Sequence, residues 1–148
     1  MKMKSLILLI VGLSFTAMGC ARSYVGTFTG TVSVSQGGGS QAIPTQATLN
    51  ITTDSGSQVQ GTLTSGAGNA SITGTSTGGT LTNVLLTVTG QSQQTGFGAQ
   101  LIQGYPYTGS LSYSGDRLTG TLNQVGGVAQ QPGTQAVAGP SIAIDVRR

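Results

Sequence analysis

The chain has 148 residues, of which 25 are glycine and only 6% are charged, and it contains no histidine, no tryptophan and one cysteine. This length predicts one modest domain with a core of its own. The formal net charge is +3, and it falls by two to +1 once Lys2 and Lys4, in a segment expected to be removed, are left out. Since nucleic-acid binding relies on many phosphate-neutralising cations, this composition argues against a nucleic-acid partner.

The first 19 residues have the three parts of a secretion signal. Lys2 and Lys4 precede an apolar run over residues 6–13, which fades through small residues toward Cys20. Even with residues 14–16 included, a run of about 11 residues at about 1.5 Å each covers only half of a roughly 30 Å hydrocarbon core, so a spanning helix is not expected. We predict that residues 1–19 are a cleaved signal peptide.

Cys20 ends the tetrapeptide Ala17-Met18-Gly19-Cys20, which resembles the lipobox of bacterial lipoproteins. The resemblance implies that Cys20 receives a diacylglycerol and becomes the acylated first residue of the mature chain, with palmitate-type chains anchoring it in the cell envelope. Residues 20–23 would then be the lipid anchor and a short tether. Ala21, in place of Asp, resembles sequences that diderm bacteria sort to the outer membrane. The alternative is an ordinary cleavage site after Gly19 that leaves Cys20 as a free thiol.

From residue 24 onward, apolar residues recur with a period of two, which predicts half-buried strands and no helix. Phe28 and Val32, for example, share one face of their segment, whereas Thr29 and Thr31 share the other. Glycine-rich turn sequences separate the segments. The eight predicted strands cover residues 24–34, 47–52, 58–64, 71–75, 84–88, 105–113, 117–123 and 142–147.

Eight strands with short connections predict a single all-β domain over residues 24–148, folded as an antiparallel up-and-down (meander) barrel. In strand count it resembles lipocalin and other calycin barrels. A β-sandwich is the alternative, because periodicity does not show whether the first and last strands pair. Inward glycines such as Gly30, Gly61 and Gly120 suit a tightly curved barrel. A transmembrane barrel needs apolar side chains facing lipid, whereas the Thr/Ser/Gln face here has to meet water, so we expect a soluble barrel that is tethered by its end.

Candidate catalytic chemistry is sparse. The sequence at residues 74–78 fits the G-x-S-x-G pattern of a nucleophile elbow, but that motif needs a histidine base and a following helix. Asp54 and Asp116 lie in turn sequences, where bonding to the local backbone is expected, and Asp145 should face outward near Arg147 or Arg117. With no histidine or glutamate and one cysteine, we predict a noncatalytic protein without metal or cofactor.

Two groups of residues are candidates for contact with other molecules. Because the last strand of an even-stranded meander runs antiparallel to the first, Arg147 and Arg148 should lie beside Arg22, near the lipid, as a membrane-proximal basic collar. Solvated terminal arginines are the alternative. The candidate lining of an apolar ligand site is aromatic: Phe28, Tyr105, Tyr107 and Tyr113.

The sequence therefore predicts a lipid-anchored envelope lipoprotein that acts as a noncatalytic binding or structural module, holding a small apolar ligand inside the barrel. Packed tyrosines that simply fill the interior are the alternative interpretation of the aromatic set. The alternative function is a surface adhesion or assembly protein that uses its Thr-rich outer face and loops. The expected partner is the membrane, through the anchor, and no protein partner is identified.

Overall fold

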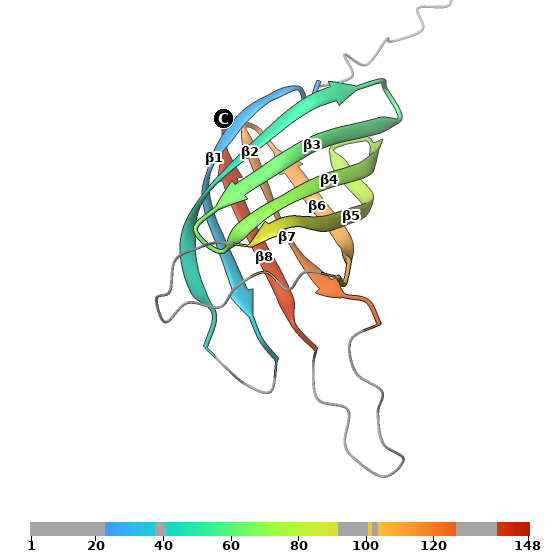
Figure 1. Ribbon diagram of the computed structural model, residues 1–148. Helices are drawn as coiled ribbons and strands as arrows, with labels where there is room; N and C mark the ends of the chain where they lie inside the picture. The colour runs from blue at the N-terminus through green and yellow to red at the C-terminus, as the bar shows by residue number, and fades with distance from the viewer. Residues whose placement is uncertain (1–22, 38–40, 92–100, 102–103, 127–138) are drawn as a thin grey trace, which may run out of the picture.

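The computed structural model describes residues 23–37, 41–91, 101, 104–126 and 139–148 (Figure 1). Within these residues, no helix is long and apolar enough to cross a membrane. The described strands are β1 (Gly26–Ser35), β2 (Ile43–Asp54), β3 (Gln58–Ser65), β4 (Gly68–Thr77), β5 (Thr80–Gln91), β6 (Tyr107–Ser114), β7 (Arg117–Gln124) and β8 (Ser141–Arg147).

These strands form a closed antiparallel barrel in which each pairs with the next and β8 returns to pair with β1. The closing ladder runs from Thr29 opposite Arg147 to Ser35 opposite Ser141. The predicted eight-stranded up-and-down barrel is therefore confirmed, the sandwich alternative is wrong, and the architecture is consistent with a calycin-like barrel. Several strands begin away from the predicted positions: β2 starts four residues earlier than expected, and β6 starts at Tyr107 instead of Tyr105.

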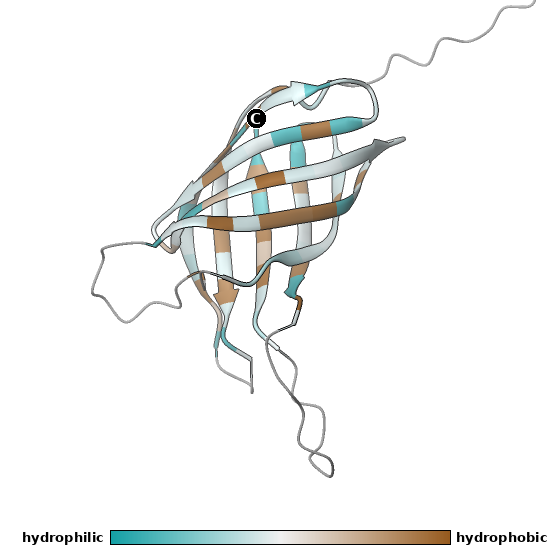
Figure 2. Ribbon diagram, turned by 45° about the vertical axis from the view of Figure 1, so that its right-hand side comes forward, coloured by the Kyte–Doolittle hydropathy of each residue, from teal (hydrophilic) through white to brown (hydrophobic). Residues whose placement is uncertain are grey.

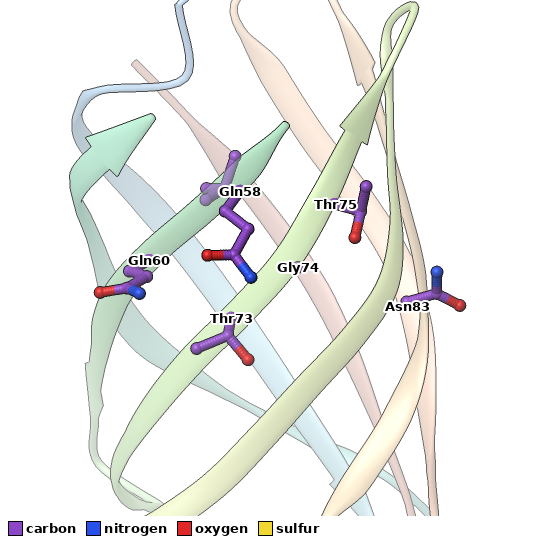
Figure 3. A pocket seen from close by; sticks show the side chains of 7 residues that line it. Gln58, Gln60, Thr73, Gly74, Thr75 and Asn83 are labelled. Carbon is purple, nitrogen blue, oxygen red and sulfur yellow. The ribbon is translucent and has the colours of Figure 1, made fainter. Parts of the chain in front are cut away.

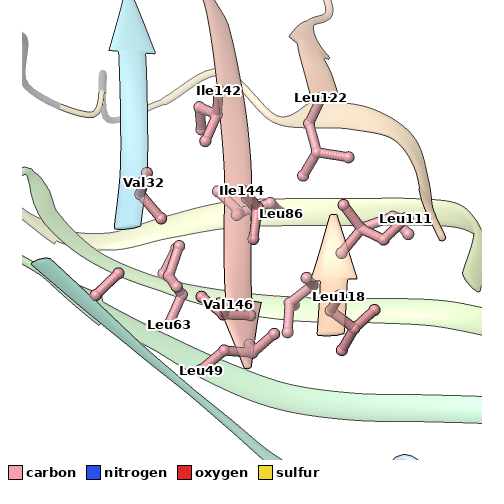
Figure 4. Close-up of a cluster of buried hydrophobic side chains, with 14 of the residues drawn as sticks. Val32, Leu49, Leu63, Leu86, Leu111, Leu118, Leu122, Ile142, Ile144 and Val146 are labelled. Carbon is pink, nitrogen blue, oxygen red and sulfur yellow. The ribbon is translucent and has the colours of Figure 1, made fainter. Parts of the chain in front are cut away.

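The core fills the centre of the barrel with the inward half of each alternating pattern. Leu49, Leu63 and Leu86 are fully buried, and residues from all eight strands join them in one cluster (Figure 4). No polar or charged residue in the described part of the chain is buried. Along the strands in Figure 2, brown hydrophobic stretches accordingly alternate with stretches that are pale or teal. The outward side chains are mostly hydroxyls and amides, the reverse of the pattern in a transmembrane barrel.

Glycines on the inward-facing side allow neighbouring backbones to approach closely. A Cβ added at Gly30 would lie 2.2 Å from the carbonyl oxygen of Asp145, and one at Gly120 would lie 2.4 Å from that of Ser110. Both partners are backbone atoms of adjacent strands, so no side chain can move aside. At these positions a side chain larger than hydrogen would force the paired strands apart.

The barrel has two unlike ends. At the terminal end, the chain enters β1, leaves β8 at Arg148, and makes three tight turns over residues 54–58, 77–80 and 114–117. The far end receives the longer connections over residues 36–42, 92–106 and 125–140. Within the described residues, every charged side chain lies at the terminal end or within the last three residues of β8: Asp54, Asp116, Arg117, Asp145, Arg147 and Arg148.

Candidate functional site

The residues that precede β1 are held against the terminal end by Asp54. The backbone N–H of Tyr24 donates to one carboxylate oxygen of Asp54 at 2.9 Å, and the N–H of Gly56 donates to the other at 3.1 Å. The second bond is the local turn bond expected from the sequence. The first bond joins residues 30 positions apart, so one carboxylate fixes both the β2–β3 turn and the incoming chain.

Arg148 holds the same segment from the opposite end of the chain. Its guanidinium donates to the carbonyl oxygens of Val25 at 2.7 Å and Ser23 at 3.2 Å. It also lies over the Phe28 ring, 5.0 Å from the ring centroid, a cation–π contact worth about 0.5–1 kcal/mol at exposed sites. The N–H of Arg148 donates to the Asp116 carbonyl at 2.8 Å. We call Asp54 and Arg148, with the segment Ser23–Val25 that they hold, the terminal clamp.

Three aromatic rings close the terminal end beneath this clamp. The ring centroid of Tyr113 lies 4.9 Å from that of Tyr24 and 6.1 Å from that of Phe28, the latter in an edge-on arrangement. Tyr24 is 2% exposed, and its hydroxyl is buried without a hydrogen bond of normal geometry. Burial raises the pKa of Tyr24, and the nearby Ser76 hydroxyl offsets this only in part. The clamp therefore sits over an apolar plug.

The four aromatic residues predicted to line a ligand site do not share one face. Phe28 and Tyr107 are fully buried and Tyr113 nearly so, whereas Tyr105 is 44% exposed. Tyr105 precedes the first residue pair of β6, which joins Tyr107 to Gln124. Tyr105 was predicted to face inward because the two-residue alternation begins two residues before the true start of β6. Tyr24, which was not among the predicted lining residues, packs instead against the ring of Tyr113.

The predicted basic collar is only partly within the described residues, because Cys20 and Arg22, like the predicted signal peptide, lie outside them. Arg147 and Arg148 do lie at the terminal end, beside the chain that enters β1. The Arg148 guanidinium already donates hydrogen bonds to carbonyl oxygens of the segment that precedes β1, and the Asp54 carboxylate lies at the same end. Among the described residues, three arginines are balanced by three aspartates, so these side chains carry no net charge at neutral pH.

Arg117 and Asp145 form a two-bond ion pair on the outer wall between β7 and β8. The Arg117 Nε donates to one carboxylate oxygen at 2.7 Å and its terminal nitrogen donates to the other. These bonds hold the pKa of Asp145 below its ordinary value, and Asp145 raises the pKa of Arg117. Both groups are exposed, so the pair is a modest contributor to stability. The outward position expected for Asp145 is confirmed.

No group of three or more metal-ligating side chains is found among the residues that the structure describes. The G-x-S-x-G match lies on β4 and its turn into β5, so the strand-to-helix context of a nucleophile elbow is missing. Comparison with family models, with curated proteins and with solved structures finds no match.

Proposed function

We propose that this protein is a lipid-anchored, noncatalytic binding or structural module of a bacterial cell envelope, held with its terminal end toward the membrane. The observation that supports this orientation is the terminal clamp. Ser23 follows Cys20 by three residues, which span about 10 Å when extended. Because Asp54 and Arg148 fix Ser23–Val25 to the barrel, acyl chains on Cys20 would hold that end close to the headgroups.

This arrangement points the far end of the barrel away from the bilayer. The strands have seven to twelve residues, which at about 3.3 Å each and with the usual tilt put the two ends roughly 20 Å apart. The longer connections leave the barrel at the far end. The outer wall and the far end are then the surfaces available to partners in the envelope.

In this proposal, acyl chains hold the protein on the membrane and the arginines contribute little. Lipidation contributes about 0.8 kcal/mol for each buried methylene group. An arginine beside an anionic surface contributes about 1 kcal/mol, and aspartates at the terminal end oppose that attraction. Membrane retention should therefore persist at high salt, where a purely electrostatic association would be lost.

The anchor is tested by metabolic labelling with a fatty-acid analogue in a diderm bacterial host, comparing the wild type with Cys20→Ser. The wild type should carry the label and sediment with outer membranes at both low and high salt. Cys20→Ser should be unlabelled and released from the membrane fraction, whereas Arg147→Ala should remain bound. An unlabelled wild-type protein, or one released by salt, would contradict the proposal.

Between the two binding modes, the structure favours the outer face over the interior. Core side chains fill the barrel, and the aromatic plug of Tyr24, Phe28 and Tyr113 covers its terminal end. Hydroxyl and amide side chains are instead exposed on consecutive strands from β1 to β5. A hydrophobic fluorescent probe distinguishes the two modes. Probe uptake that weakens in Tyr107→Ala would support a ligand inside the barrel, whereas no probe uptake would support binding at the outer face.

A further inference from the structure

The outer wall carries a shallow hollow on β3, β4 and β5, separate from the terminal clamp (Figure 3). Its volume is about 230 Å³. The side chains that contribute to it come from three neighbouring strands, and they are almost all uncharged and polar. The lining residues are Gln58, Val59, Gln60, Thr73, Gly74, Thr75 and Asn83.

A β-bulge places Asn83 on the outer face, at the edge of this hollow. Between the pairs Leu81↔Leu111 and Val84↔Gly109, β5 has one residue more than its partner strand. Leu81 and Val84 are both buried, so the two residues between them lie on the outside. Asn83 has a φ of +48°, and among the described residues it is the only one besides glycine with a positive φ. Asparagine tolerates this conformation better than most residues, and bulges of this kind re-aim side chains.

The two glutamines reach the hollow as members of cross-strand pairs. Gln58 lies opposite Thr75, and Gln60 lies opposite Thr73, with all four side chains on the outer face. In Figure 3, Gln58 extends from β3 toward β4, and Asn83 stands on the far side of the hollow. In the described structure, the side chains of these five residues make no hydrogen bond to protein.

The chemistry of the lining defines the ligand. A side-chain amide offers both a donor and an acceptor, and so does a hydroxyl. No charged side chain lines the hollow. The nearest carboxylate in the strand ladder belongs to Asp54, opposite Val59, and it already accepts the N–H groups of Tyr24 and Gly56. A ligand that suits this site is neutral and presents several groups that each donate and accept.

We propose that this hollow binds one unit of a neutral saccharide, whose hydroxyl groups both donate and accept hydrogen bonds. Its volume lies below the roughly 300–1,000 Å³ of pockets for drug-sized ligands, so it suits one sugar ring of a longer chain. No aromatic side chain lies in the lining to stack on the sugar, and we therefore expect weak binding. The inference rests on the proposed binding role of the outer face and is independent of the lipid anchor.

The test is a titration of the isotopically labelled, full-length Cys20→Ser chain with two neutral oligosaccharides, maltohexaose and chitotetraose, followed by amide NMR. We expect at least one of them to shift the resonances of residues 58–60, 73–75 and 83 in a saturable way. Because Cys20→Ser carries no acyl chain, the result is separate from that of the labelling experiment. No shift with either sugar, or equal shifts with a neutral peptide, would overturn the inference.

Two variants locate the site and one controls for the substitution. Asn83→Gly keeps the positive φ and removes the amide, and it should weaken binding about fivefold to tenfold, as should Gln60→Ala. Gln91→Ala removes an exposed amide from the end of β5, outside the hollow, and should leave binding unchanged. If Asn83→Gly binds as the unaltered protein does, or if Gln91→Ala is equally impaired, the hollow is not the site.

Discussion

Replacement of Gly30 by alanine tests whether β1 and β8 close the barrel. Gly30 lies opposite Val146 in the closing ladder. The added Cβ would lie 2.2 Å from the Asp145 carbonyl oxygen and 2.8 Å from the Val146 Cα. Because Cβ contacts in proteins rarely fall below 3.4 Å, the two strands have to separate by about 1 Å at this point.

The cost follows from this separation. Overpacking of a well-packed interior costs about 1–3 kcal/mol, and one or two weakened ladder hydrogen bonds add about 1 kcal/mol each. Alanine has less backbone freedom than glycine in the unfolded chain, and this offsets the loss of stability by about 0.4–1 kcal/mol. We expect a net loss of about 2–4 kcal/mol, a large part of the roughly 5–15 kcal/mol typical of a domain, and a Tm lowered by roughly 10 °C.

The assay is urea unfolding followed by far-UV circular dichroism, with Gly139→Ala as the matched control. At Gly139, no heavy atom lies within 4 Å of the position that an added methyl group would take, and φ is not positive. Its replacement should therefore change the free energy of unfolding by less than about 0.5 kcal/mol. If Gly30→Ala were as stable as Gly139→Ala, β1 and β8 would not be paired in solution and the barrel would be open.

Three further predictions concern the terminal end and the ion pair. Arg117 lowers the pKa of Asp145, so the pair stabilises the fold at any pH above the ordinary carboxyl pKa of 3.8 and loses its effect as the pH falls through the lower pKa of the folded state. The Tm difference between the wild type and Asp145→Asn should therefore be present at neutral pH and vanish in strong acid. A pH-independent difference would contradict this. Burial raises the pKa of Tyr24 above 10.0, so the folded state resists ionisation of this hydroxyl and the free energy of unfolding falls as the pH rises beyond that value. Tyr24→Phe should match the wild type in stability at neutral pH and lose less stability in alkali. An identical alkaline decline in both proteins would refute the reasoning. Asp54→Ala removes two hydrogen bonds to a carboxylate and should cost about 1–3 kcal/mol while accelerating hydrogen exchange at the Tyr24 N–H; unchanged exchange would show that the clamp does not hold this segment.

The alternation of apolar and polar residues was enough to identify strands and to assign their two faces. The side chains of Leu49 and Leu63 point inward as predicted, because the two-residue period of a strand is a local property of the backbone. The turn role of Asp54 and the outward position of Asp145 were also local, since each depends on a few neighbouring residues. The error at Tyr105 arose where alternation continues past the true start of β6.

The positions of residues far apart in the chain were decided only by the tertiary structure. The bond from Arg148 to the Ser23 carbonyl joins residues 125 positions apart, and no local pattern of sequence encodes it. The bulge that turns Asn83 outward likewise reflects the register between β5 and both of its neighbours. Alternation sets which face of a strand is buried, whereas closure, register and the meeting of the two termini depend on the twist and stagger accumulated over all eight strands.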